Sequence, residues 1–478
     1  MYLGLDLGTS GLKGLLIDAD QTVVAEAAAP LTVSRPRDGW SEQCPSDWIT
    51  AAERVLDALS AQTPLDAVRG IGLSGHMHGA TLLDASDQVL RPCILWNDTR
   101  SALEAAAMDA VPDWRAISGN IVFPGFTAPK LAWVRDHEPE VFDQTACVLL
   151  PKDYLRLWLT GEKVADMSDA AGTSWLDTGA RDWSDSLLAL SGLDRSAMPR
   201  LVEGSAPSGS LRDSLAARWG LPKGVIVAGG GGDNAASAVG MGVTRPGQAF
   251  VSLGTSGVLF AATPGYAPDP DTAVHTFCHA LPGTWHQMGV ILAATDALNW
   301  FARLAGSDAA TLTADLGPLQ APQKTLFLPY LGGERTPHNS ATIRGSFLHL
   351  DHATGPVEAT RAVLEGVAFA LADCKTALAA TGTTFETCIA VGGGSKSDYW
   401  LAALATALDL PLSLPEAGDF GAAFGAARLG MMAETGDTTV ATPPRILRQI
   451  EPDRALSEAF HAAHARYRAA ASLTMDLT

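Results

Sequence analysis

A repeated hairpin pattern constrains this chain more than any other feature of its sequence. Gly8-Thr9-Ser10-Gly11 separates two short apolar runs near the N-terminus, and the same tetrapeptide recurs 246 positions later at Gly254-Thr255-Ser256-Gly257, again between two apolar runs. Two apolar runs joined by a Gly-rich turn predict a β-hairpin. Two matching hairpins, about half a chain apart, predict a duplicated fold whose halves clamp one nucleotide between them.

The residues of the first turn suit a phosphate group. Glycines leave the backbone N–H groups of a turn open to an anion that approaches closely, and Thr9 and Ser10 add hydroxyl donors. Asp6 is the one charged residue in the apolar run before the turn. Its carboxylate is placed to hold a divalent cation beside the phosphate, directly or through water.

Composition restricts the classes of partner. A net charge of −19 and a pI near 4.9 argue against binding to nucleic acids or anionic membranes. No apolar stretch approaches the ~18 residues of a membrane span, and the N-terminal run lacks the basic region of a signal peptide. The six cysteines are scattered without CxxC pairs, which predicts reduced, mostly buried thiols in a cytoplasmic protein.

A loop with two histidines follows the first predicted buried strand. The strand covers residues 68 to 74, and Gly75-His76-Met77-His78-Gly79 comes directly after it. Ligands of α/β proteins bind at the carboxyl ends of strands. Metal binding by His76 and His78 lacks a further ligand nearby in the sequence, so plain packing and polar contact with a substrate remain as interpretations.

Residues 94 to 100 end another strand and open a helix. Trp96 is placed to stack on a sugar, and Asp98 to accept hydrogen bonds from its hydroxyl groups. The alternative is a capped helix start in which Asp98 pairs with Arg100.

A Gly-rich turn near the middle of the chain carries a further aspartate. A strand over residues 225 to 228 leads into four glycines, then Asp233-Asn234 and a small-residue helix. An aspartate at the tip of such a turn is well placed for general-base chemistry, although it also suits an N-cap. Pro246-Gly247 follows as a break, which divides the chain into domains 1–243 and 244–478.

The second half contains a comparable strand, turn and helix. Residues 388 to 391 predict a strand, Gly392 to Lys396 a turn, and Ser397 the start of a helix whose N-terminus faces a phosphate or adenosine. A long buried helix is predicted from Gly355 to Ala380, and a small-residue helix from Gly418 to Gly430. Neither a P-loop sequence nor a GxGxxG motif within a βαβ unit is present.

Taken in order, these motifs resemble the FGGY carbohydrate kinases, and the resemblance covers nearly the whole chain. The motifs that carry it are Asp6 to Gly11, Gly125 to His137, Gly229 to Asn234, Gly254 to Gly257 and Gly392 to Lys396. His349 and Ala359 depart from the second signature of the family, which usually has a glycine and a larger aliphatic residue there. These departures concern the packing of the long helix.

The resemblance implies an α/β fold of two actin-like domains, each with a ribonuclease-H-like core, that close on MgATP and a sugar. Asp233 is expected to be the base, and Asp6 is expected to hold Mg²⁺ through water. The expected sugar contacts are Met77, His78 and Asn234, with Trp96 and Asp98 added from the local pattern. The expected contacts to the nucleotide and its phosphates are Thr9, Ser10, Lys13, Gly254, Thr255, Gly393, Gly394, Ser395 and Lys396.

The reaction implied by the resemblance is phosphorylation of D-xylulose by ATP in xylose catabolism. Family analogy adds a homodimer. Two alternatives remain open: a kinase for another ketose or polyol, such as ribulose, gluconate or glycerol, and an actin-like ATPase that phosphorylates no small molecule. The histidine loop and the Asp233 turn favour a kinase, because an ATPase of the second kind needs no sugar pocket.

Overall fold

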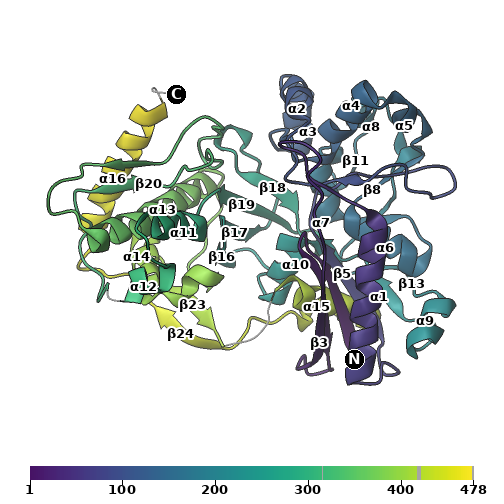
Figure 1. Cartoon of the computed structure of the whole chain (residues 1–478). Coiled ribbons are helices and arrows are strands. Elements are labelled where there is room, and N and C mark those ends of the chain that lie inside the picture. Colours follow the sequence, from purple (N-terminus) through teal and green to yellow (C-terminus); the bar gives the residue numbers. More distant parts are fainter. Residues whose placement is uncertain (315, 417–420, 476–478) are drawn as a thin grey trace.

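Two lobes, each built around one seven-stranded sheet, make up the protein (Figure 1). The structure is a computed structural model that describes residues 1–314, 316–416 and 421–475. The first lobe contains the N-terminal half of the chain and the second most of the C-terminal half. Part of the predicted helix from Gly418 to Gly430 lies outside the described residues.

The sheet of the first lobe begins with the predicted hairpin. Its strand order is β13-β14-β5-β1-β2-β3, and a short strand, β15, also pairs with β5. β1, β2 and β3 are antiparallel neighbours, whereas β5 and β14 run parallel to β1. The strands are β1 (Tyr2–Leu7), β2 (Gly11–Ile17), β3 (Val23–Pro30), β5 (Gly70–Gly75), β13 (Pro207–Ser210), β14 (Ile226–Ala228) and β15 (Gly231–Gly232).

The sheet of the second lobe repeats this plan. Its order is β18-β19-β17-β16-β22-β23-β24. An antiparallel meander lies on one side of β16; on the other side are β22 and β23, which run parallel to β16, and then β24, which is antiparallel to β23. The strands are β16 (Ala249–Leu253), β17 (Gly257–Thr263), β18 (His275–Cys278), β19 (Trp285–Ile291), β22 (Cys388–Val391), β23 (Leu412–Pro415) and β24 (Ile446–Ile450). The duplicated α/β fold and both hairpins predicted from the sequence are therefore confirmed.

Helices and small two-stranded sheets accompany the sheet of the first lobe, and most of them lie in the connection between β5 and β14. The small sheets pair β4 (Glu42–Gln43) with β7 (Cys93–Ile94), β6 (Thr81–Leu83) with β8 (Cys147–Leu149), β9 (Val164–Asp166) with β12 (Arg200–Val202), and β10 (Leu176–Asp177) with β11 (Asp182–Trp183). The helices of this lobe are α1 (Pro45–Gln62), α2 (Ala102–Asp109), α3 (Pro112–Ser118), α4 (Thr127–His137), α5 (Pro139–Gln144), α6 (Pro151–Thr160), α7 (Met167–Ala170), α8 (Asp185–Leu190), α9 (Asp213–Trp219) and α10 (Asp233–Gly240).

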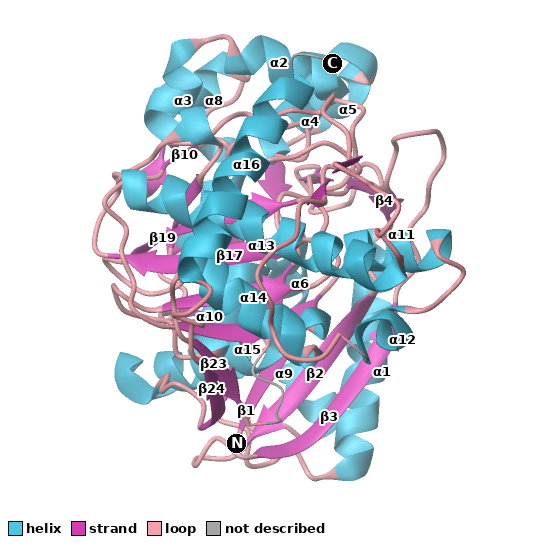
Figure 2. Ribbon diagram, turned by 90° about the vertical axis from the view of Figure 1, so that its left-hand side faces the viewer, coloured by secondary structure: helices cyan, strands magenta, loops and turns pink. Residues whose placement is uncertain are grey.

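Helices of the second lobe cover its sheet, and the long helix α13 is at their centre (Figure 2). Most α13 side chains from Ala359 to Leu378 are buried, as its apolar residues on more than one face predict. The helices are α11 (Thr295–Leu304), α12 (Ala309–Ala314), α13 (Pro356–Ala380), α14 (Asp398–Leu408), α15 (Ala422–Thr435) and α16 (Ser457–Met475), and β20 (Leu326–Leu328) pairs with β21 (Ser346–Leu348). In the described part of the chain, every helix is too short or too polar to cross a membrane.

Helix α15 returns from the second half of the chain to the first sheet, where it packs on β1, β5 and α10. Glycines make this approach close. A Cβ atom on Gly72 would lie 1.7 Å from the carbonyl oxygen of Ala426, and one on Gly425 would lie 1.7 Å from that of Ala236. Since backbone atoms cannot move aside, only glycine fits at these contacts. The division at residue 243 stays a proposal, and α15 is the element that crosses it.

All six cysteines are free thiols, and five of them are buried, as their scattered spacing predicts.

A hydrophobic cluster joins the lobes, because Met77 and Phe126 of the first lobe belong to the same core as Phe250 and Phe277 of the second.

Candidate active site

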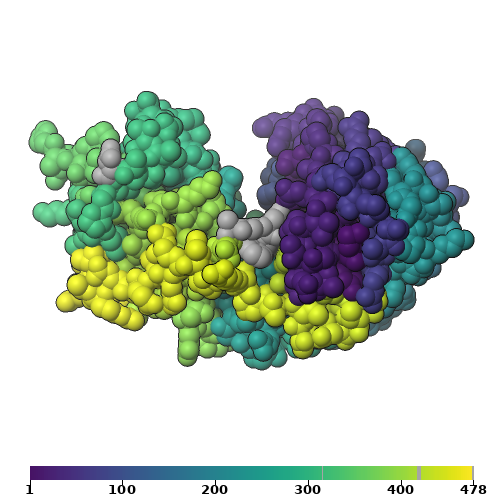
Figure 3. All heavy atoms as spheres, turned by 90° about the horizontal axis from the view of Figure 1, so that it is seen from below, coloured from purple at the N-terminus to yellow at the C-terminus, as the bar shows by residue number. Residues whose placement is uncertain are grey.

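A hollow separates the two lobes in the space-filling view (Figure 3). The predicted loops follow the carboxyl ends of β1 and β5 in the first lobe and of β16 and β22 in the second. Both sheets thus carry their loops at the edge where ligands of α/β proteins bind.

Two side chains hold the first turn in place. The turn is closed by a hydrogen bond of 2.9 Å from the Gly8 N–H to the Gly11 oxygen. The Gln43 side-chain amide donates to the Thr9 carbonyl at 2.7 Å, and the Trp96 indole N–H donates to the Thr9 hydroxyl at 3.0 Å. Since the Thr9 hydroxyl accepts from Trp96, its own hydrogen remains available to a ligand. The motif search assigned no role to Gln43.

Oxygen donors gather next to this turn. Asp6 lies opposite Lys13 across the hairpin and beside Ser74 in the parallel pair of β1 and β5. Carboxylate and hydroxyl oxygens are ligands that Mg²⁺ accepts, and Mg²⁺ usually keeps several waters and binds through few protein groups. The donor set at Asp6 therefore fits such a cation. The Lys13 ammonium is 3.1 Å from Glu26 and half-buried.

The second turn has the same sequence but a different anchor. Its Gly254 carbonyl accepts hydrogen bonds of 2.8 Å from both the backbone N–H and the hydroxyl of Thr295, the first residue of α11. The Thr255 carbonyl accepts a 2.8 Å bond from the Ala294 N–H. The start of α11 thus fixes the turn through its carbonyl groups.

His78 occupies a strained position at the tip of the loop after β5. Its φ of 71° lies in the left-handed region, its ring stacks on Phe126 at 4.5 Å, and its Nδ1 lies 2.6 Å from the Gly172 oxygen. The Lys130 ammonium donates to the His78 carbonyl at 2.8 Å. Burial, with a smaller contribution from Lys130, lowers the pKa of His78 to about 3. The ring is neutral at physiological pH, which suits hydrogen bonding to a sugar better than proton transfer.

His76 faces a different environment, where the Trp48 ring meets it edge-on at 5.9 Å. It is buried, and burial lowers its pKa to about 3 as well. Within residues 1–314, 316–416 and 421–475, no group of three His, Cys, Asp or Glu side chains is arranged to hold a metal ion. Trp48 packs against His76, and neither ring nitrogen of His76 has a hydrogen-bond partner among the described residues.

The structure separates the roles open to Trp96 and Asp98. Trp96 is 48% exposed and reaches the Thr9 hydroxyl, so it lies at the rim of the hollow beside the first turn. Asp98 is buried, with its carboxylate bonded to the Ser41 N–H at 2.6 Å and to the Arg100 guanidinium at 2.7 and 2.9 Å. The ion pair considered as the alternative for Asp98 is thus present.

Asp233 is the first residue of α10, and Gly232 occupies the N-cap position. The Asp233 carboxylate accepts two hydrogen bonds from Asn234, at 2.7 Å from the backbone and 3.0 Å from the side chain, both on Oδ1. No hydrogen bond from the described residues falls on Oδ2. Burial raises the pKa of Asp233. A Cβ atom on Gly232 would lie 2.9 Å from Met77, so the loop that carries Met77 and His78 is in contact with the Asp233 turn.

A cavity of ≈ 510 Å³ lies beside the turn after β22. Gly394 lies so close to the rest of the lobe that a Cβ atom would be 2.9 Å from the Trp400 ring. The predicted Gly393, Gly394 and Lys396 line the cavity, and Ser395 hydrogen-bonds back to Gly392 at 2.7 Å. Motif reading missed the other lining residues, which come from separate helices; they include Thr295, Leu298, Asn299, Thr313 and Trp400.

Known proteins match this chain along most of its length. Residues 1–240 match the N-terminal domain of the FGGY family of carbohydrate kinases, and residues 249–434 match its C-terminal domain. The chain is 49% identical to the xylulose kinase of Escherichia coli strain K12 over 96% of this chain and 94% of that protein. It is 52% identical to the xylulose kinase of Klebsiella pneumoniae over 91% and 90% of the two chains. A crystal structure of a xyloylose kinase from Brucella ovis superimposes with a TM-score of 0.99, at 61% identity and full coverage of both chains.

Proposed function

The chain belongs to the FGGY family of carbohydrate kinases, and from this premise we propose that it transfers the γ-phosphoryl group of ATP to D-xylulose, forming D-xylulose 5-phosphate and ADP. The observation that carries the proposal is the contact between the Met77–His78 loop and the Asp233 turn. It brings Met77 and His78 next to a carboxylate at the edge where both sheets present their loops. Relatives that are about half identical over nearly the whole chain support xylulose as the sugar.

Asp233 is the general base in this proposal. The oxygen–hydrogen bond of the terminal sugar hydroxyl breaks, its proton passes to Asp233, and the oxygen forms a bond to the γ-phosphorus. The bond between that phosphorus and the leaving oxygen of ADP breaks in the same displacement. A carboxylate whose pKa is raised by burial accepts a proton more readily than an exposed one. Asn234 keeps its Oδ1 occupied, so Oδ2 is the acceptor.

The sugar lies between Met77, His78, Asn234 and the Asp233 carboxylate, and the exposed ring of Trp96 forms the rim. We assign Asp98 a structural role. Its carboxylate already accepts hydrogen bonds from the Ser41 N–H and the Arg100 guanidinium, so it holds Arg100 in place instead of contacting the sugar. The Phe126 ring and the Gly172 carbonyl orient His78. Preorganised contacts of this kind place the reacting hydroxyl without a rearrangement of the His78 side chain.

The two Gly-Thr-Ser-Gly turns hold the phosphates. Thr9 and Ser10 approach from the first lobe, and Gly254 and Thr255 approach from the second. Asp6 would hold Mg²⁺, which would supply positive charge to offset the charge of the transferring phosphoryl group. Lys13 must leave Glu26 to reach a phosphate; their ion pair is partly exposed and therefore weak. Removing divalent cations with EDTA is expected to abolish turnover, and Mg²⁺ is expected to restore it.

The adenosine part of ATP occupies the cavity lined by Gly393, Gly394 and Lys396, with Ser395 at its edge. The volume of ≈ 510 Å³ is within the range of small-molecule sites. The cavity belongs to the second lobe and the sugar pocket to the first, so transfer requires the two lobes to act together. Closure of the lobes is expected to exclude water and to suppress ATP hydrolysis without sugar.

The test is ADP release by the purified protein with MgATP and a panel of D-xylulose, D-ribulose, L-xylulose, glycerol, gluconate and no sugar. A selective response to D-xylulose is the expected result. A response to another sugar alone would replace the substrate and leave the kinase assignment. Equal release in every well, including the one without sugar, would mean an ATPase and would overturn the proposal.

We further propose a cytoplasmic location, supported by the free thiols, and a homodimer by family analogy. Light scattering on the purified protein measures whether it is a dimer.

A further inference from the structure

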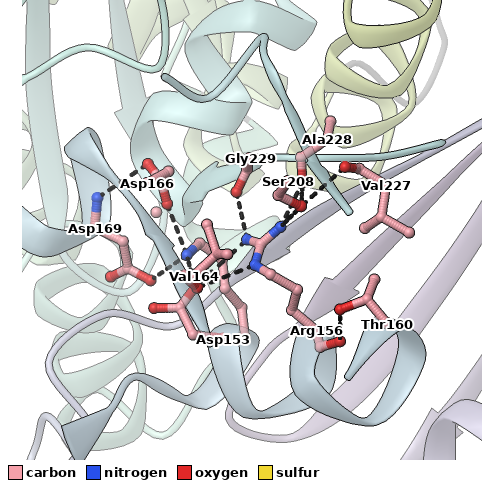
Figure 4. Close-up of polar contacts among 12 residues, drawn as sticks. Asp153, Arg156, Thr160, Val164, Asp166, Asp169, Ser208, Val227, Ala228 and Gly229 are labelled. Carbon is pink, nitrogen blue, oxygen red and sulfur yellow. Dashed lines mark hydrogen bonds and ion pairs between the residues drawn. The ribbon is translucent and has the colours of Figure 1, made fainter. Parts of the chain in front are cut away.

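A buried ionic cluster, which the proposed mechanism does not use, lies beside Ala228 and Gly229, where the turn that leads to Asp233 begins (Figure 4). The Lys152 ammonium contacts three carboxylates, those of Asp153 at 2.5 Å, Asp166 at 2.6 Å and Asp169 at 3.1 Å. All four side chains are fully buried. Burying charges is expensive, and a well-packed apolar cluster would give similar stability. The cluster therefore calls for an explanation beyond stability.

Arg156 connects the cluster to the beginning of the turn. Its guanidinium contacts Asp153 and donates to the carbonyl oxygens of Ala228 and Gly229, where β14 ends and the glycines begin. A further bond of 2.7 Å joins it to the Ser208 hydroxyl, which itself donates to the same strand. The exit of the chain from β14 is thus fixed by charge-assisted hydrogen bonds.

Ser168 connects the cluster to the end of the turn. Its hydroxyl donates to Asp166 at 2.5 Å and accepts a 3.1 Å bond from the N–H of Gly232, the residue before Asp233. Asp166 also accepts hydrogen bonds from the backbone N–H groups of Ser168 and Asp169, at 2.8 and 3.2 Å. Lys152 therefore orients Asp166, Asp166 orients the Ser168 hydroxyl, and this hydroxyl fixes the amide next to Asp233.

We propose that Ser168 is a positioning residue for the phosphoryl transfer: through Gly232 it holds the Asp233 carboxylate at the depth and angle from which it meets the sugar hydroxyl, and Asp166 and Lys152 hold Ser168. The proposal rests on the proposed role of Asp233. Glycines make the turn flexible, so its two ends need anchors. Misplacement of a reacting group by about 1 Å costs about 10²-fold in rate.

The test compares Ser168→Ala, Asp233→Asn and the double variant, each assayed for kcat and for both KM values. Ser168→Ala is expected to lower kcat about 10-fold and to leave the KM for ATP unchanged, because the nucleotide lies on the other lobe. Ser168→Thr, which keeps the hydroxyl, is expected to recover most of kcat. Ser191→Ala is the matched control: Ser191 is also buried in this lobe, but its hydroxyl bonds to Trp175 and Leu187 and not to the turn that carries Asp233.

The double variant separates positioning from a general loss of packing. If Ser168 acts through Asp233, Ser168→Ala lowers kcat little further once Asp233 is already asparagine. A structural role instead predicts the same fold-loss in both backgrounds, and that result would overturn the proposal. So would a Ser168→Ala kcat within about two-fold of the wild type.

The pH profile is an independent readout, and it stays informative if Ser168→Thr does not fold. A looser turn admits water to the Asp233 carboxylate, so the acid limb of kcat is expected to move to lower pH in Ser168→Ala and to stay in place in Ser191→Ala. An unmoved limb in Ser168→Ala counts against positioning. If Asp233→Asn alone keeps nearly full turnover, the assignment of the base fails instead, and this outcome is distinct from failure of the Ser168 proposal.

Discussion

The two lobes share one sheet topology but carry different chemistry at equivalent positions. The loop after the first parallel strand is His76-Met77-His78 in the first lobe, where all three side chains are largely buried, and Gly392 to Lys396 in the second, where most residues are open to the cavity. In the proposed function, the buried side chains of the first loop bind the small sugar, and the glycines of the second provide a surface on which the larger nucleotide lies against the backbone. One scaffold thus supports both kinds of loop, because the strands position the loops and the side chains on the loops determine which ligand they suit.

The two Gly-Thr-Ser-Gly turns differ although their sequences are identical. Leu7 pairs with Leu12 across the first hairpin, whereas Leu253 pairs with Gly257 across the second, so the second register is one residue tighter. A one-residue shift reverses which side of the sheet the following side chains face. Gly257 lies opposite Ile291, and a Cβ atom there would be 2.6 Å from the Ile291 side chain.

The largest effect is expected at Asp233, one of the two aspartates that begin helices after the Gly-rich turns. Asp233→Ala is expected to lower kcat by about 10² or more and to leave ATP binding intact, because it removes the base alone. Asp398→Ala is the matched control, since Asp398 also begins a helix but is exposed and pairs with Arg448 at 2.6 Å. Steady-state kinetics measure both. Equal losses of kcat in the two variants would mean that the effect comes from replacing the first residue of a helix and that Asp233 is not the base.

A second test concerns the helix that crosses between the halves. Gly425→Ala is expected to lower the free energy of unfolding by about 1–3 kcal/mol, because the new Cβ meets the Ala236 carbonyl on α10. Urea unfolding followed by fluorescence measures this loss. Gly265→Ala is the control, because nothing lies within 4 Å of its Cβ position. If both variants unfold alike, α15 does not fasten the second half to the first sheet.

A third test compares substitutions in the two equivalent loops, which follow β5 and β22. His78→Ala is expected to raise the KM for the sugar about 10-fold, and Lys396→Ala to raise the KM for ATP by a similar or smaller factor. Each variant is expected to leave the other KM nearly unchanged, since the loops belong to different lobes. Initial rates with one substrate saturating give both values. A crossed result, with His78→Ala affecting only ATP, would reverse the assignment of the lobes.

The smallest effect is a shift along the pH axis. The base must be ionised, and burial raises the pKa of Asp233, so kcat is expected to fall with decreasing pH at a midpoint above the ordinary ~4 of an aspartate. His76 and His78 do not produce this limb, because burial lowers the pKa of both to about 3. Turnover at saturating substrates across pH 4–8 measures it. A limb of the same midpoint in Asp233→Asn would assign the titration to another group.

Local pattern predicted the elements well where the signal is short-range. The hairpins, the strand over Cys388 to Val391 and the helix from Pro356 to Ala380 have the expected positions, because apolar runs and glycine breaks act on neighbouring residues. The resemblance to a kinase family added the site residues, whose roles remain proposals. Asp233 was open to two readings, and the structure places it one position inside its helix, with Gly232 as the cap.

Long-range contacts were beyond the reach of the sequence. Nothing near Thr9 shows that Gln43 and Trp96 hold it, and nothing near Asp233 points to Ser168, which lies more than sixty residues away in the chain. By itself the sequence determined that the chain is duplicated, where the glycine turns lie and which family it belongs to. Only the tertiary structure decided the register of the second turn, the return of α15 to the first sheet and the support behind Asp233. These depend on close packing between distant segments, and such packing leaves no periodic trace in the sequence.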